Sequence, residues 1–243
     1  MTGAAAGLDG STILVIGGSS GIGYEIARQA AGAGASVTIT GRDERRLAAA
    51  AKRLGAQARC LDAHDKDQLE AAFAAVRQAD HVVSMAGDSM AGGFLQTTPE
   101  TMRHVLHSKF LANWMIGRHA ARILAPGGSL TFTSGTGGRP HEVSATYVAN
   151  LGISALVQGL AVEMAPRHRV NAVAPTFMGT ATAFWRDTPA DELASQQAAF
   201  AATVPLRRTA TASEVAAAYL MLMTSTFVTG QVLAVDGGVM LAK

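Results

Sequence analysis

A glycine-rich segment near the start of the chain is the clearest candidate for chemistry with a phosphate group. Residues 17–23 are Gly-Gly-Ser-Ser-Gly-Ile-Gly and follow a short apolar run at 12–16. Glycine lets a backbone turn sharply and approach a pyrophosphate, and the N-terminus of a following helix attracts the anion. The expected dinucleotide contacts are Gly17, Ser19, Ser20, Gly21, Ile22 and Gly23. A simple tight turn is the alternative in a chain with 26 glycines.

The ends of the next two apolar runs supply candidates for nucleotide selectivity. The run at 36–40 is followed by Gly41 and Arg42. An acidic residue here would hydrogen-bond a ribose 2′-hydroxyl, whereas an arginine accommodates a 2′-phosphate. Arg42 therefore favours NADP(H) over NAD(H), with a solvated arginine at the start of the next helix as the alternative. Asp62, just after the run at 58–61, is placed either to contact adenine or to cap a helix.

Two other constellations suggest different chemistry, and both are incomplete. His104 and His107 lie on one predicted helix, but no cysteine or carboxylate completes a metal-ligand set, and Lys109 would oppose a cation nearby. We therefore predict no metal site. Ser134 follows a strand, yet its surroundings are Thr-Ser-Gly-Thr-Gly rather than the G-x-S-x-G of a hydrolase elbow, and no histidine or acid stands out as its partner.

The elements that must position these residues alternate along the chain. Seven β-branched runs predict strands at 12–16, 36–40, 58–61, 81–85, 129–133, 169–174 and 231–235. Alanine-rich stretches with helical spacing lie between most of them, at 22–32, 44–54, 68–76, 99–124, 147–164 and 214–223. This alternation predicts an α/β fold, a single Rossmann-type domain over 1–243 with a doubly wound parallel sheet of seven strands and helices on both faces.

Composition excludes several other classes of protein. The chain has 243 residues, 49% apolar and 16% charged, so it has enough apolar side chains for a large core. Its net charge of +2 is scattered, which argues against a nucleic-acid partner. The uncharged stretches 143–162 and 215–235 contain too many polar residues to predict membrane spans. Cys60 is the only cysteine, and together with an N-terminus unlike a signal peptide it predicts a cytoplasmic protein.

With these motifs in order, the chain resembles the short-chain dehydrogenase/reductase family from about Ser11 to Val239. The glycine loop matches the family's T-G-x-x-x-G-x-G, with Ile16 in place of the threonine. Residues 169–175 match R-V-N-A-V-x-P, with Thr176 replacing the following glycine, and 229–231 and 235–238 match the last strand and its flanks. The resemblance implies a nicotinamide dinucleotide cofactor, with further contacts from Ala86, Gly87, Pro175 and Thr180.

The resemblance also implies a catalytic pair, but one member of the expected site is missing. Ser134 and Tyr147 are 13 positions apart, as are the family's catalytic serine and tyrosine. The family has a lysine four residues after the tyrosine, one helical turn away, and this chain has Leu151. A nearby cation lowers the pKa of a phenol from about 10, so its loss weakens Tyr147 as a proton donor and acceptor.

A second departure suggests how the lost cation is replaced. Aligning the helix after Pro99 on Met102 puts Lys109 where the family has its active-site asparagine. In one interpretation Lys109 directs its ammonium group toward the position left by Leu151 and acts in catalysis. In the other the site has drifted, and Lys109 extends to solvent. The S-K-F helix with variable tyrosine and lysine positions looks like that of a divergent bacterial branch of the family.

The resemblance leads us to expect an NADP(H)-dependent oxidoreductase that interconverts a carbonyl and an alcohol. Apolar and aromatic residues in 176–204, among them Phe177, Phe184, Trp185 and Phe200, suggest that this segment covers an apolar small-molecule substrate, or that it forms a subunit contact. The family expectation for assembly is a homodimer or homotetramer. The alternative function is a nucleotide-binding protein without hydride transfer, acting as a sensor or subunit partner.

Overall fold

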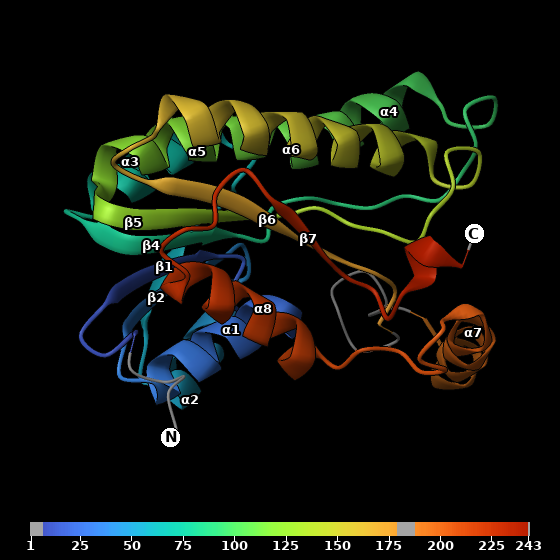
Figure 1. Cartoon of the computed structure of the whole chain (residues 1–243), viewed down its shortest axis with the longest axis horizontal. Coiled ribbons are helices and arrows are strands. Elements are labelled where there is room, and N and C mark those ends of the chain that lie inside the picture. Colours follow the sequence, from blue (N-terminus) through green and yellow to red (C-terminus); the bar gives the residue numbers. More distant parts are fainter. Residues whose placement is uncertain (1–6, 179–187, 243) are drawn as a thin grey trace.

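The apolar runs of the sequence form seven parallel strands (Figure 1). The computed structural model describes residues 7–178 and 188–242. In sheet order the strands are β3 (Gln57–Cys60), β2 (Ser36–Gly41), β1 (Thr12–Ile16), β4 (Ala79–Ser84), β5 (Leu124–Thr133), β6 (Arg169–Pro175) and β7 (Val232–Val235). The order reverses between β1 and β4, and the carboxyl ends of parallel strands at such a point form a ligand-binding crevice. The predicted fold class is confirmed.

Side chains of β1 alternate between two apolar cores, one on each face of the sheet. Ile13 and Val15 pack into the core beneath α1 (Gly21–Gly32), α2 (Glu44–Leu54) and α8 (Ala212–Thr224). Leu14 and Ile16 pack into the opposite core. The helices on that face are α3 (Lys66–Ala74), α5 (Ala112–Ile123) and α6 (Ser144–Glu163). Because both faces of the sheet are covered, the central strand β1 is apolar along nearly its whole length, whereas the edge strand β3 is largely exposed.

Two helix starts follow from capping signals in the sequence. Thr98 caps α4 (Pro99–Val105) by accepting from the Thr101 backbone N–H, with Pro99 in the first turn. Thr211 and Glu214 form a reciprocal capping box at α8. The helix-cap alternative for Asp62 is wrong, because Asp65 caps α3.

The helix expected over 99–124 differs from prediction, because a π-helical segment interrupts it. Between α4 and α5 lies η1 (Leu106–Leu111), where the Ser108 hydroxyl donates to the Val105 carbonyl at 3.3 Å. The Asn113 side chain fastens the segment by donating to the Lys109 carbonyl at 2.5 Å and to the Ala86 carbonyl at 3.0 Å. Single π turns are frequent at functional sites, and this one carries Lys109.

The segment after β6 contains a helix that the sequence did not indicate. Helix α7 (Ala190–Thr203) has no buried residue, and it therefore lacks the apolar face whose periodicity would reveal it. A short 3-10 turn, η3 (Val239–Leu241), is also unpredicted. The candidate residue Thr180, together with Phe184 and Trp185, lies outside the described residues.

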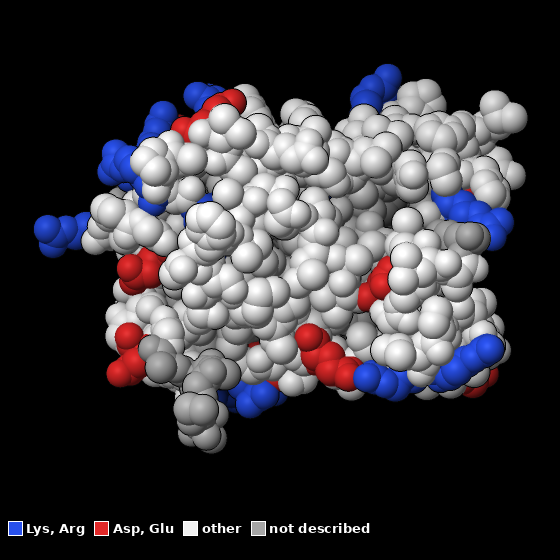
Figure 2. All heavy atoms as spheres, viewed as in Figure 1, with Lys and Arg blue, Asp and Glu red and all other residues white. Residues whose placement is uncertain are grey.

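One described helix, α6, is long and apolar enough to cross a membrane by length and composition alone, a test that the core helix of a soluble protein also passes. Its Ala149, Ile153 and Val157 are fully buried in the fold. Figure 2 shows blue and red side chains of both signs around the rim of the viewed face, with no large patch of one sign.

Candidate functional site

The turn between β1 and α1 is packed so closely that several of its positions accept only glycine. Gly17 and Gly21 have positive φ angles of 86° and 57°. A Cβ at Gly18 would lie 2.6 Å from Ile39 Cγ2, and one at Gly23 would overlap the Gly17 carbonyl oxygen. Ser20 begins α1 without a side-chain cap, so the first N–H groups of the helix stay free to bind an anion. The geometry fits the pyrophosphate cradle expected here.

This turn forms one end of a cleft of 1240 Å³ that runs along the carboxyl ends of the strands. With the exception of Thr180, every candidate residue lines it. The lining candidates are Gly17, Ser19, Ser20, Gly21, Ile22, Gly23, Arg42, Asp62, Ala86, Gly87, Lys109, Ser134, Tyr147 and Pro175. A cleft of this size, with glycines at one end and polar side chains at the other, fits a dinucleotide with space for a substrate.

Two arginines lie where the ribose of an adenine nucleotide is expected. Arg42 is exposed at the end of β2, and Arg46 lies one helical turn further along. The Arg46 Nε atom is buried without a hydrogen-bond partner among the described residues, and its guanidinium lies 4.0 Å from Asp43. Arg46 is therefore a second candidate for phosphate contact, which the sequence analysis treated only as a neighbour of Arg42.

Asp62 lines the same cleft, two residues beyond the carboxyl end of β3. Its carboxylate accepts from the His64 backbone N–H at 3.0 Å, and its own N–H donates to the Gln68 side chain at 2.9 Å. The turn is therefore held in place by its own hydrogen bonds while Asp62 lines the cleft.

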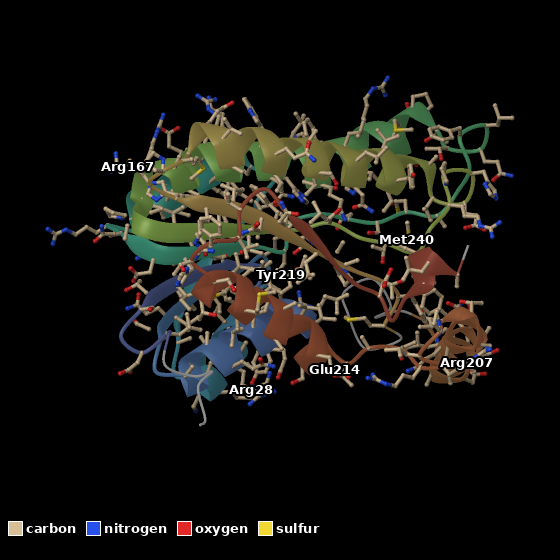
Figure 3. All side chains as sticks on the ribbon, in the orientation of Figure 1. Arg28, Arg167, Arg207, Glu214, Tyr219 and Met240 are labelled. Atoms are coloured by element: carbon tan, nitrogen blue, oxygen red, sulfur yellow. The ribbon has the colours of Figure 1, made fainter. Side chains whose placement is uncertain are left out.

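The carboxyl end of β5 holds Ser134 rigidly. The Ser134 N–H donates to the Val173 carbonyl of β6 at 2.8 Å. The neighbouring Thr133 hydroxyl donates to the Ser84 carbonyl at 2.7 Å and shares a hydrogen bond of 2.7 Å with the Tyr219 hydroxyl. Tyr219 points from α8 toward the sheet (Figure 3). In this state the Ser134 hydroxyl donates to the Asn150 carbonyl at 3.4 Å.

Lys109 is buried inside the site, with only 6% of its surface exposed. Its stem lies across Gly87, where a Cβ would come within 2.8 Å of Lys109 Cγ. The ammonium donates to the Ser134 carbonyl oxygen at 3.4 Å. No carboxylate in the described part of the chain lies within ion-pair distance of it. The drift interpretation expected Lys109 to extend to solvent, and the structure shows it buried instead.

Burial sets the charge state of Lys109. Removal of the ammonium from water lowers the pKa of Lys109 to about 8, and the negative charge of Asp88 opposes part of that shift. The side chain is therefore mostly charged at pH 7 and loses its proton at a lower pH than an exposed lysine does.

Tyr147 and Leu151 lie one turn apart on α6, and both line the cleft. Leu151 is 56% exposed, like several other leucines of the chain, and it stands where the sequence resemblance leads us to expect a lysine. The structure brings Lys109 to Ser134 rather than into hydrogen-bond contact with Tyr147. The Tyr147 hydroxyl has no hydrogen-bond partner within residues 7–178 and 188–242, so it is free to meet a substrate.

Sequence reasoning missed two polar features of the site. Asn150 donates to the Gly135 carbonyl at 3.2 Å, while its own side-chain oxygen is buried without a partner in the described structure. At the rim of the cleft, Asp88 and His104 form a hydrogen-bonded pair at 2.8 Å. For Asn150, the only signal in the sequence was its position beside Leu151. For the pair of Asp88 and His104, the sequence contains no pattern that predicts their contact.

No group of three or more metal-ligating side chains gathers among the described residues. His104 has Asp88 as its partner, whereas His107 stacks edge-on against His64 with ring centroids 6.2 Å apart.

Comparison with known proteins agrees with this geometry. The family model described as enoyl-(acyl carrier protein) reductase matches residues 16–240. A short-chain dehydrogenase/reductase, ATR9, from Stachybotrys chlorohalonatus is 31% identical, covering 96% of this chain and 98% of that protein. Galactitol 2-dehydrogenase (L-tagatose-forming) from Cereibacter sphaeroides is 34% identical, covering 95% of each.

The solved structure of a short-chain type dehydrogenase/reductase from Mycobacterium ulcerans has a TM-score of 0.86 and 30% identity, covering 97% of this chain and 91% of that one. The residues matched by the family model, 16–240, include the glycine turn, Ser134 and Pro175. The chain belongs to the short-chain dehydrogenase/reductase family of oxidoreductases, which use a nicotinamide cofactor on small-molecule substrates.

Proposed function

We propose that this protein is an NADP(H)-dependent oxidoreductase that interconverts a carbonyl and an alcohol, with Ser134, Tyr147 and Lys109 as its catalytic residues. The observation that carries the proposal is the buried ammonium of Lys109. It lies in the same cleft as Ser134 and Tyr147, without a carboxylate partner in the described structure. Burying a charge is costly unless it is used or paired, so a drifted site would not retain one.

Different residues would bind the two halves of the dinucleotide, at the two ends of the cleft. The backbone around Gly17, Gly21 and Gly23 would hold the pyrophosphate, and Arg42 a 2′-phosphate. Ala86, Gly87, Pro175 and Thr180 are proposed to line the nicotinamide half. When bound, the cofactor supplies or accepts the hydride.

The proton is handled by side chains of this chain. Ser134 donates its hydroxyl hydrogen to the substrate carbonyl oxygen and polarises it, and the Tyr147 hydroxyl exchanges a proton with that oxygen. Lys109 donates to the Ser134 backbone carbonyl and lines the same cleft as Tyr147. Its positive charge would stabilise negative charge that develops on the substrate oxygen during proton transfer.

The competing function is nucleotide binding without hydride transfer, as in a sensor or a subunit partner. Leu151 favours that reading, because it removes the cation that lies closest to the tyrosine in the family. Purified protein with NADPH and a panel of ketones, aldehydes, quinones and sugar ketones separates the two. We expect substrate-dependent loss of NADPH absorbance with an apolar carbonyl. NADPH binding without turnover on the whole panel would support the competing function.

The proposed substrate is apolar, and the proposed assembly is a homodimer or homotetramer in the cytoplasm. Phe177 and Met178 line the cleft beside Pro175, which supports an apolar substrate. The name of the galactitol relative makes a polyol the competing substrate class.

A further inference from the structure

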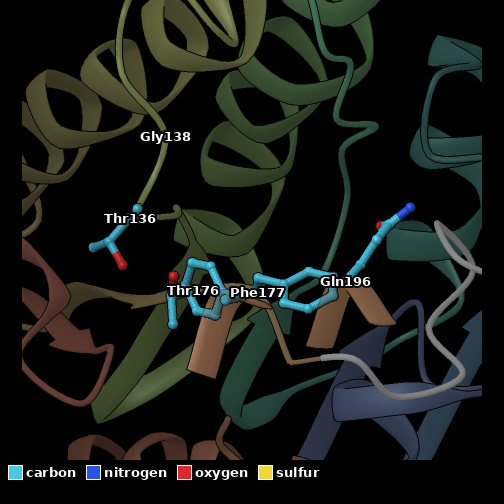
Figure 4. Close-up of a pocket in the computed structure, with 7 residues that line it drawn as sticks. Thr136, Gly138, Thr176, Phe177 and Gln196 are labelled. Atoms are coloured by element: carbon cyan, nitrogen blue, oxygen red, sulfur yellow. The ribbon is translucent and has the colours of Figure 1, made fainter. Parts of the chain in front are cut away.

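A smaller cavity of 290 Å³ adjoins the cleft, between the loop after β5 and helix α7. We call it the side chamber. Its lining residues are Thr136, Gly137, Gly138, Thr176, Phe177, Gln196 and Phe200 (Figure 4). All but Gln196 and Phe200 also line the cleft, and Thr136 is two residues beyond Ser134. A substrate whose carbonyl reaches Ser134 therefore has this chamber next to it.

Two hydroxyl groups in the side chamber are buried without partners. The Oγ1 atoms of Thr136 and Thr176 are shielded from solvent, and neither has a hydrogen-bond partner in the described structure. Figure 4 shows both hydroxyls directed toward the space between the two threonines. Thr176 stands against Gly137, where a Cβ would lie 2.5 Å from the threonine oxygen. Unpaired buried hydroxyls are costly, and both belong to residues that line the chamber, so a ligand oxygen that reaches them would relieve this cost.

The remainder of the chamber is apolar and aromatic. The rings of Phe177 and Phe200 meet edge to face, with centroids 5.2 Å apart and an interplanar angle of 68°. The Gln196 amide nitrogen donates to Glu192 on the surface of α7, so that group is already engaged. An apolar cavity of about 150 Å³ holds benzene. The volume of 290 Å³ therefore admits two fused rings.

We propose that the side chamber binds the non-reacting part of the substrate, an oxygenated fused aromatic ring system whose hydroxyl or carbonyl oxygen bridges Thr136 and Thr176. The rings pack against Phe177 and Phe200, which favour offset and edge-to-face contacts. A polyol fits poorly, because most of its hydroxyls would lose water against apolar walls that offer only two partners. This inference rests on the proposed function for the orientation of the substrate.

Equilibrium binding tests the chamber without turnover. We would titrate the protein, with and without NADPH, with 2-naphthol, naphthalene and galactitol, and follow the two aromatic ligands by fluorescence and the polyol by calorimetry. We expect 2-naphthol to bind more tightly than naphthalene. Thr136→Val and Thr176→Val should each weaken 2-naphthol by about 2- to 13-fold, the value of one neutral hydrogen bond, and leave naphthalene unchanged. Phe200→Leu should weaken both aromatic ligands.

Thr131→Val is the matched control. Thr131 also has a buried unpartnered hydroxyl, but it lines neither cavity, so its loss should change no affinity. The inference is overturned if 2-naphthol and naphthalene bind equally well, if the two valine variants bind 2-naphthol like the wild type, or if galactitol binds more tightly than 2-naphthol. Selective 2-naphthol binding without turnover on any carbonyl would support the chamber while contradicting the proposed function.

Discussion

At the β1–α1 end of the cleft, the three glycines of the family motif are kept, and the backbone geometry requires them. At the other end, the family resemblance leads us to expect a lysine, an asparagine and a glycine where this chain has Leu151, Lys109 and Thr176. We propose that the first end binds the nicotinamide cofactor of the family, whose pyrophosphate would explain why these glycines are kept. In the proposed function the second end meets the substrate, and there a charge and a hydroxyl group stand where the resemblance predicts neither. The comparison teaches that Lys109 and Thr176 are where the particular chemistry of this protein is to be found.

The largest effect is expected at the cofactor end. Gly23→Val should abolish nucleotide binding, because the new side chain overlaps the Gly17 carbonyl oxygen. Gly32→Val on the same helix is the matched control, since a Cβ at Gly32 meets no atom within 4 Å. Fluorescence titration with NADPH measures both. Gly21→Ala, at a φ of 57°, serves as the second variant if Gly23→Val does not fold. Normal NADPH binding by folded Gly23→Val would remove the dinucleotide site from this turn.

At the end of the cleft that holds Ser134 and Tyr147, which we call the reaction end, the charge of Lys109 should lower the free energy of unfolding. Its pKa falls from 10.5 to about 8 on folding, so the unfolded chain binds more protons between these pH values and stability rises with pH there. Lys109→Met should raise the free energy of unfolding at pH 7 by roughly 3 kcal/mol, and the gain should shrink toward pH 10.5.

Urea unfolding at pH 7 and at higher pH measures this difference. Lys52→Met, at an exposed position on α2, is the control and should change little. A Lys109→Met protein less stable than wild type at pH 7 would mean that the ammonium is paired in the fold rather than reserved for function.

A third prediction concerns Arg42 and the preference for NADPH over NADH. Arg42→Ala should lower the preference for NADPH over NADH by about 10- to 150-fold, because a hydrogen bond to a charged group is lost. Arg45→Ala is the matched control, since Arg42 lines the cleft and Arg45 does not. Titration of each protein with both cofactors gives the ratio. Equal wild-type affinity for NADH and NADPH would contradict the proposed preference.

The smallest expected effect is on the pH profile of the reaction end. A reduction that depends on charged Lys109 should slow as pH rises through about 8, where the lysine loses its proton. In Lys109→Met, the decline near pH 8 should be absent, because no lysine titrates there. Profiles of kcat/KM from pH 6 to 10 decide this. Identical profiles for the two proteins would separate Lys109 from the proton transfer.

The sequence predicted the sheet because most of its strands are short runs that contain β-branched residues, although the edge strand β3 has none. It could not reveal α7, whose side chains are all at least partly exposed and therefore carry no apolar period. The π turn was hidden because Leu106 to Leu111 has ordinary helical composition, and its wider winding depends on Ser108 and Asn113 contacts across the fold. The unpartnered hydroxyls of Thr136 and Thr176 arise only when β5 and β6 end side by side.

The central claim is that Lys109 and Tyr147 act together in a carbonyl/alcohol oxidoreductase. The most direct measurement is a double-mutant cycle on kcat/KM with NADPH and the best carbonyl substrate, using Lys109→Met, Tyr147→Phe and the pair. General acid–base assistance is worth about 10²- to 10⁴-fold, and groups acting as one unit are not additive. We predict that each single variant loses activity within that range and that the double variant is little worse than either. Wild-type activity in Lys109→Met, or losses that multiply in the double variant, would contradict the claim.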